Sequence, residues 1–158
     1  IPTMPLYALF GCLEHCDINA KLAESLREIF TQMCQRQDVD LFLVSALLRA
    51  HAGAPSDTAH WLIEAVLERP ELHHREIFVA IAGRCWRSLA NESVLDRFLI
   101  ALADQHDAAL FQQIYTDLVM LPPLRGALLT RLHGHTSPAL TQAMARMQQA
   151  VTQTTHDH

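Results

Sequence analysis

Apolar residues along this chain recur at three- and four-residue intervals, which is the spacing of one face of an α-helix. The clearest stripe is Leu22, Leu26, Phe30 and Met33, and it follows Asn19, a residue type that favours the N-cap. Valine-, isoleucine- or threonine-rich runs that could alternate as strands are missing. The pattern therefore predicts an all-α protein.

Caps and breakers divide the pattern into nine expected helices. Their approximate ranges are 6–16, 20–35, 39–52, 56–69, 72–89, 91–105, 107–120, 122–134 and 137–149. The caps on which these ranges depend are Asn19, Asp38, Asn91, Asp107 and Ser137. Gly53 stands where a helix C-cap prefers glycine, whereas Gly83, inside the fifth range, suggests a close approach of two helices there.

The chain also matches itself. A shift of 35 residues places Phe42, Val44, Ala46 and Arg49 over Ile77, Val79, Ile81 and Arg84. A further shift of 33 places Ile77, Phe78, Ile81 and Cys85 over Leu110, Phe111, Ile114 and Leu118. Periods of this length are typical of helix-pair repeats. We expect antiparallel helix pairs stacked as an irregular HEAT-like α-solenoid over 1–150, with a frayed tail over 151–158; a compact multi-helix bundle is the alternative.

Composition narrows the class of protein. Of 158 residues, 50% are hydrophobic and only five are glycine, as expected for one well-packed domain. The net charge is −5 and the arginines alternate with acids, so no basic stripe for nucleic acid is predicted. Charges interrupt every apolar run, so we expect no membrane span.

Reactive side chains do not form a recognisable site. The four cysteines lie in apolar helical stretches and are expected to be buried free thiols; Cys12 and Cys16, four apart, could otherwise supply half of a metal site. Glu14, His15, Cys16 and Asp17 are the densest reactive cluster, but neighbours on a helix diverge. No phosphate-loop, dinucleotide, zinc-protease or serine-hydrolase motif occurs. We therefore predict no metal, no cofactor and no enzymatic activity.

The best candidate for contact with a partner is Arg84, Trp86 and Arg87. Trp86 lies beside the apolar stripe of the fifth expected helix, with an arginine on each side. Tryptophan and arginine dominate interface hot spots. The alternative is that Trp86 packs on the next helix of the stack.

Three segments resemble the C-terminal part of an uncharacterised proteobacterial family of unknown function: IAGRCWRSLA (81–90), DLVMLPPLR (117–125) and SPAL (137–140). The resemblance covers about residues 77–140. It implies a bacterial cytoplasmic protein whose separate N-terminal region would precede this chain, and it assigns no catalytic or binding residue. The opening Ile1-Pro2-Thr3, without a signal peptide, also suggests a fragment.

Two functions stay open. The first is a non-enzymatic helical-repeat module that binds a protein partner or its own N-terminal domain. The second is an accessory or substrate-binding domain of an enzyme whose catalytic residues lie upstream.

Overall fold

The structure is a computed structural model that describes residues 3–134 and 137–156. Over these residues the chain forms nine α-helices, three short 3₁₀ helices and no strand, which confirms the all-α prediction. The elements are α1 (Thr3–Leu13), α2 (Ala20–Cys34), α3 (Leu41–His51), α4 (Ser56–Leu67), η1 (Pro70–Leu72), α5 (Arg75–Arg84), η2 (Trp86–Ala90), α6 (Glu92–Ala103), α7 (Ala108–Val119), α8 (Pro122–Thr130), η3 (Arg131–His133) and α9 (Pro138–His156).

Most expected caps are present. The side chains of Asn19, Asn91 and Asp107 each accept a hydrogen bond from a backbone N–H in the first turn of α2, α6 and α7. The predicted cap Asp38 is wrong, because Asp40 takes that role and accepts from the N–H groups of Phe42 and Leu43. The helix α3 therefore begins two residues after its expected start.

The prediction of one continuous fifth helix over 72–89 is also wrong. Its first part is η1, and α5 begins only after His74, whose Nδ1 accepts from the Glu76 N–H. At the other end, Cys85 leaves the helical conformation (φ −103°, ψ 16°) and η2 follows. Local capping and a 3₁₀ turn thus divide a segment whose apolar spacing is continuous.

Other helix ends shift in the same way. The helix α1 ends at Leu13 instead of Cys16, α8 ends at Thr130, and α9 continues to His156 instead of ending near Gln149. The ends of helices depend on hydrogen bonds that the apolar pattern does not encode.

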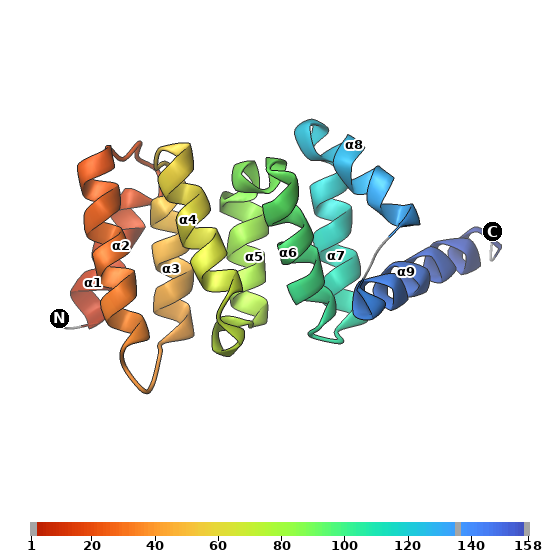
Figure 1. The fold of residues 1–158 in the computed structure, drawn as a ribbon, viewed down its shortest axis with the longest axis horizontal. Coiled ribbons are helices and arrows are strands. Elements are labelled where there is room, and N and C mark those ends of the chain that lie inside the picture. Colours follow the sequence, from red (N-terminus) through yellow and green to blue (C-terminus); the bar gives the residue numbers. More distant parts are fainter. Residues whose placement is uncertain (1–2, 135–136, 157–158) are drawn as a thin grey trace. The chain divides into compact units, whose positions relative to one another are not determined.

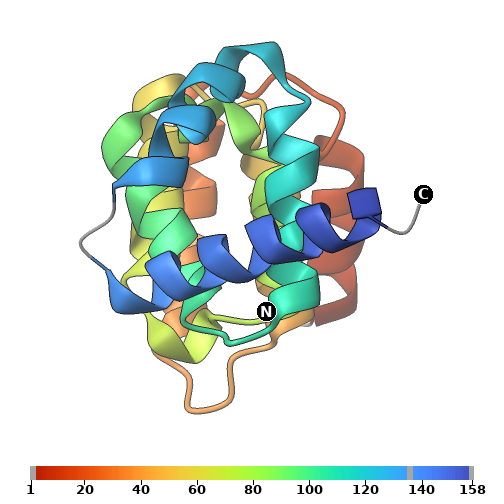
Figure 2. The same ribbon diagram turned by 90° about the vertical axis from the view of Figure 1, so that its right-hand side faces the viewer.

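The chain divides into two compact units, residues 1–88 (unit 1) and 89–158 (unit 2). In unit 1, α3 lies between α1 and α5, and α2 and α4 lie side by side in a second layer (Figures 1 and 2). Three phenylalanines are fully buried in this unit: Phe10, Phe30 and Phe78. The single domain expected over 1–150 stays a prediction, since two compact units can still fold as one domain.

In unit 2, α7 contacts α6, α8 and α9, and α9 also contacts α6. The buried Tyr115 hydroxyl on α7 donates to the Leu128 carbonyl on α8. Arg131, in η3, pairs with Asp96 and Glu92 of α6. Polar contacts therefore fix the end of α8 and η3 against the preceding helices.

Burial tests the self-match residue by residue. The shift of 33 pairs buried positions with buried positions, from Ile77 over Leu110 to Cys85 over Leu118. The shift of 35 does not, because it places exposed Phe42 over buried Ile77 and buried Val44 over exposed Val79. A shift of 34 pairs five buried positions of α3 with five buried positions in α5 or directly after it. The positions in α3 are Leu43, Val44, Ala46, Leu47 and His51, and they match Ile77, Phe78, Ala80, Ile81 and Cys85 in that order. The repeat itself stays a prediction.

Candidate functional site

The three predicted contact residues lie at one end of unit 1. Arg84 is the last residue of α5, whereas Trp86 and Arg87 belong to η2, so the expectation that all three share one helix is wrong. Arg84 and Arg87 are exposed and Trp86 is half-buried. The tight 3₁₀ turn keeps the three residues close together.

Arg87 lies over the ring of Trp86. The guanidinium carbon is 5.3 Å from the ring centroid, within the range of a cation–π interaction. Among the described residues, no carboxylate pairs with Arg87. The unit therefore presents a partly exposed aromatic ring and an unneutralised cation at the same place.

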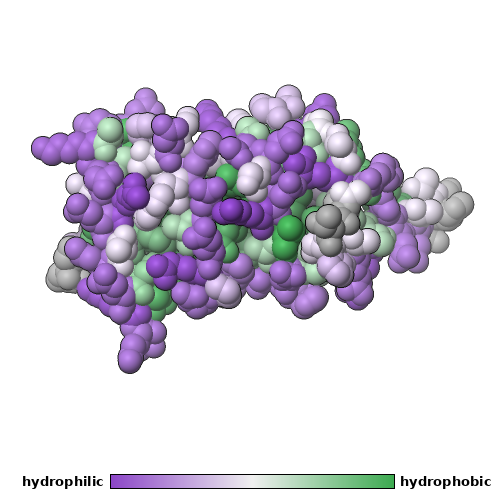
Figure 3. Space-filling view, in the orientation of Figure 1, coloured by the Kyte–Doolittle hydropathy of each residue, from purple (hydrophilic) through white to green (hydrophobic). Residues whose placement is uncertain are grey.

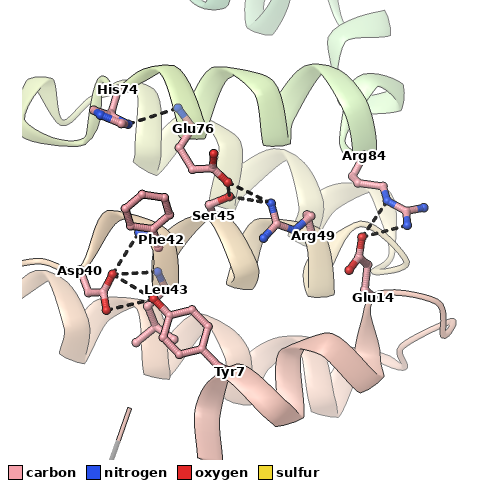
Figure 4. Close-up of polar contacts among 10 residues, drawn as sticks. All are labelled: Tyr7, Glu14, Asp40, Phe42, Leu43, Ser45, Arg49, His74, Glu76 and Arg84. Atoms are coloured by element: carbon pink, nitrogen blue, oxygen red, sulfur yellow. Dashed lines mark hydrogen bonds and ion pairs between the residues drawn. The ribbon is translucent and has the colours of Figure 1, made fainter. Parts of the chain in front are cut away.

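Arg84 reaches a different part of the chain. One of its terminal nitrogens lies 2.8 Å from a carboxylate oxygen of Glu14, and its Nε donates to the same oxygen at 3.0 Å (Figure 4). A terminal nitrogen of Arg84 also lies 3.4 Å from Nδ1 of His15. The end of α5 is thus tied to the link that follows α1. No sequence signal indicated this contact between residues 70 positions apart.

The link between α1 and α2 also closes on the link between α3 and α4. The Ile18 N–H donates to the Gly53 carbonyl at 3.2 Å, and a Cβ on Gly53 would lie 2.3 Å from the carbonyl oxygen of Cys16. Gly53 does not have a left-handed φ, so the prediction that it is glycine because it caps the C-terminus of a helix is wrong. It is glycine because two backbone segments touch there. Gly83, in contrast, meets nothing within 4 Å, and the close helix approach expected there is wrong.

These links enclose two hollows that share Arg84 and Arg87. The outer crevice, of about 350 Å³, is lined by Glu14, His15, Cys16, Asp17, Ala52, Gly53, Gly83, Arg84, Trp86 and Arg87. The second hollow is a cavity of about 250 Å³, bounded by the end of α3, the first turns of α4 and residues 84–88. The Glu14–Asp17 cluster therefore faces the predicted contact residues.

Two polar residues of the cavity wall are nearly fully buried. His51 is 2% exposed, and its Nε2 has no hydrogen-bond partner among the described residues. Burial lowers the pKa of His51 to about 4, against a smaller opposing effect of the carbonyls of Ala23 and of His51 itself. Ser88 is 4% exposed and lines the same cavity. Neither residue stood out in the sequence as a candidate.

The cysteines are free thiols, but not all of them are buried as expected. Cys12 and Cys16 are exposed, and Cys34 is half-buried. Cys85 is buried, donates to the Leu48 carbonyl, and has its pKa raised to about 12 by that burial. Within residues 3–134 and 137–156, no three His, Cys, Asp or Glu side chains group as they would to hold a metal ion.

In the part of the chain that the structure describes, no helix combines the length and apolar character needed to cross a bilayer. A family model described as "protein of unknown function (DUF3549)" matches residues 1–148. The chain belongs to this family. The predicted membership of a family of unknown function is therefore confirmed, and the match is wider than residues 77–140. No curated protein and no solved structure matches the chain.

Proposed function

We propose that this chain is a non-enzymatic, HEAT-like helical-repeat module that binds a protein partner, or its own N-terminal domain, through Arg84, Trp86 and Arg87. The observation that carries the proposal is the half-buried Trp86 ring beneath the Arg87 cation, which has no carboxylate partner in the described part of the chain. A ring that is already partly packed loses little side-chain entropy when a partner covers it, and its remaining apolar surface is then removed from water.

The distribution of apolar surface in unit 1 supports the same function. Its exposed large hydrophobic residues are Met4, Leu9, Phe42 and Val79, and all lie on α1, α3 or α5. The α2 and α4 side of the unit is mostly hydrophilic (Figure 3). A partner that docks on this layer would cover these four described residues.

The ionisation of two of the cysteines, Cys34 and Cys85, supports a non-enzymatic role. Burial raises the pKa of Cys85 to about 12, and the pKa of Cys34 is also raised, chiefly by burial. Both shifts disfavour the thiolate that would attack a substrate. We also propose that the protein has no nucleic-acid partner, because its net charge is −5 and its basic residues alternate with acids. A bacterial cytoplasmic location is proposed from the family resemblance alone.

The cavity of about 250 Å³ behind Arg87 favours a second function, the substrate-binding domain of an enzyme whose catalytic residues lie upstream. The two functions differ in what occupies this end of unit 1. A protein partner would cover the outer crevice, whereas a substrate would enter the cavity.

Site-specific photo-crosslinking tests the proposal. A photoreactive residue at Gly83 suits the site because Gly83 lines the crevice and has open space where a Cβ would lie. The matched control position is Glu28, which is exposed on α2. In the full-length protein in its own cells, we expect one discrete protein adduct, or an intramolecular adduct, from position 83 and none from position 28. Equal adducts from both positions, or none from position 83, would contradict a partner surface here.

A further inference from the structure

The cavity in unit 1 has a volume of about 250 Å³. That is slightly below the range of roughly 300–1,000 Å³ for pockets that take drug-sized ligands. Its size suits a smaller molecule. Its wall combines four parts of the chain: Asp17, residues 51–54, the first turns of α4, and the segment with Arg84, Cys85, Arg87 and Ser88.

Polar groups line this wall. The His51 ring is buried and its Nε2 has no hydrogen-bond partner among the described residues, which is unusual for a polar group removed from water, and Ser88 lies on the same wall. The N-cap of α4 is Pro55, which has no polar side chain, and the N–H groups of Ser56 and Asp57 bond to no described residue. Ser56 also lines the cavity. A ligand that accepts hydrogen bonds would satisfy the N–H groups at the start of α4 and the Ser88 hydroxyl.

Charge favours an anionic ligand. Two arginines, Arg84 and Arg87, line the cavity, against one carboxylate, that of Asp17. Glu14 already neutralises Arg84 through their 2.8 Å ion pair. Arg87 is therefore the cation that remains available, and the N-terminus of α4 adds partial positive charge on the opposite wall.

We propose that this cavity binds the oxyanion of a small molecule, a carboxylate or a phosphate, with Arg87 as its main cationic contact and Ser88 as a hydrogen-bond donor. The planar guanidinium group offers paired N–H donors that match the two oxygens of either group. The proposal concerns the isolated chain and does not depend on the protein partner proposed above.

The experiment titrates the whole chain with sodium phosphate and, separately, with sodium succinate. Sodium chloride holds the ionic strength constant, because any salt screens surface charge. Thermal unfolding and ¹⁵N-resolved NMR spectra are followed. We expect at least one of the two anions to raise the unfolding midpoint in a saturable way, and to shift the amide signals of Ser56, Asp57 and Ser88.

Three variants locate the binding. Arg87→Gln should weaken the binding of that anion at least tenfold, and it should fold normally because Arg87 is exposed and forms no ion pair among the described residues. Ser88→Ala should weaken it severalfold. Arg36→Gln, which removes the same charge from the exposed link between α2 and α3, should leave the affinity unchanged.

Three results would overturn the proposal. The first is that neither anion stabilises the chain more than chloride does. The second is that Arg87→Gln binds the anion as tightly as the wild type does, or that Arg36→Gln weakens binding equally. The third is that the NMR shifts lie outside the cavity. A chain that fails these tests but still gives the adduct at position 83 would keep its partner surface and lose only the anion site.

Discussion

Gly53 and Gly83 are both glycines near the C-terminal end of a helix, but their surroundings differ. At Gly53 the α3–α4 link touches the backbone of Cys16, so an added Cβ would lie 2.3 Å from that carbonyl oxygen. Backbone atoms cannot move aside as a flexible side chain can. We expect Gly53→Ala to lower the free energy of unfolding by about 1–3 kcal/mol, as measured by urea denaturation. A neutral result would mean that the two links separate at little cost.

Gly83→Ala is the matched control, and its effect should have the opposite sign. No atom lies within 4 Å of the added Cβ, and the residue is helical. Alanine limits the unfolded chain more than glycine does and favours helix, so we expect a gain of about 0.5–1 kcal/mol. The same urea titration measures it. A loss of stability would indicate a contact at Gly83 that the structure lacks.

His51 should make stability depend on pH. Its pKa is about 4 in the folded chain and 6.5 in the unfolded chain, so the unfolded chain binds this proton first as the pH falls. The folded state is therefore not penalised above about pH 6.5. It loses about 1.4 kcal/mol per pH unit between pH 6.5 and pH 4.

His51→Gln tests this assignment because glutamine keeps a polar side chain that does not titrate. Urea denaturation of both proteins between pH 4 and pH 7.5 should show a steeper loss of stability for the wild type below pH 6.5. Parallel curves would mean that the pKa of His51 is the same in the folded and the unfolded chain.

At the scale of helices, α3 and α5 are joined by a partly buried polar contact. The Ser45 hydroxyl donates to Glu76 at 3.0 Å, and Arg49 donates to both at 2.8 Å and 3.3 Å (Figure 4). Ser45 is fully buried, so loss of Glu76 leaves its hydroxyl without this acceptor. We expect Glu76→Ala to cost about 1–3 kcal/mol in urea denaturation.

Glu71→Ala is the control for loss of a carboxylate. Glu71 pairs with Arg69 at 3.6 Å, and its side chain is 58% exposed. Exposed ion pairs contribute little, so we expect a change of at most about 0.5 kcal/mol. Equal effects of the two substitutions would mean that the contact between α3 and α5 does not depend on this network.

At the scale of the whole molecule, truncation of Trp86 tests whether this residue contacts a partner or only stabilises the fold. A fully buried tryptophan loses roughly 3–5 kcal/mol on truncation, but Trp86 is only half-buried. We expect Trp86→Ala to lower the free energy of unfolding by about 1–2 kcal/mol. Partner binding should weaken by about 2 kcal/mol or more, close to thirtyfold.

Thermal melts and the intensity of the adduct from position 83 measure these two effects. Trp61→Ala is a useful comparison, because Trp61 is also half-buried, lies under Arg27 at 3.9 Å, and packs edge-on against Phe30. It lies on α4, away from the crevice. We expect it to cost stability without reducing the adduct. A large drop in the midpoint for Trp86→Ala, with the adduct unchanged, would remove Trp86 as a contact residue.

The sequence by itself determined the fold class and most helix starts. Apolar spacing is local, and caps such as Asn19, Asn91 and Asp107 act within one turn of their own helix. It also placed Arg84, Trp86 and Arg87 close together, because they are neighbours in the chain. It misplaced their helix, since the change from α5 to η2 at Cys85 does not interrupt the apolar spacing.

Only the tertiary structure decided what these residues face. The ion pair of Arg84 with Glu14, the contact of Gly53 with Cys16, and the buried groups of His51 and Ser88 join segments far apart in the sequence. Only the tertiary structure also showed which face of α3 is buried. Its buried positions match those of α5 at a shift of 34 residues, not at the expected shift of 35. Helical periodicity shows that a face exists, but the neighbouring helices determine which residues it buries.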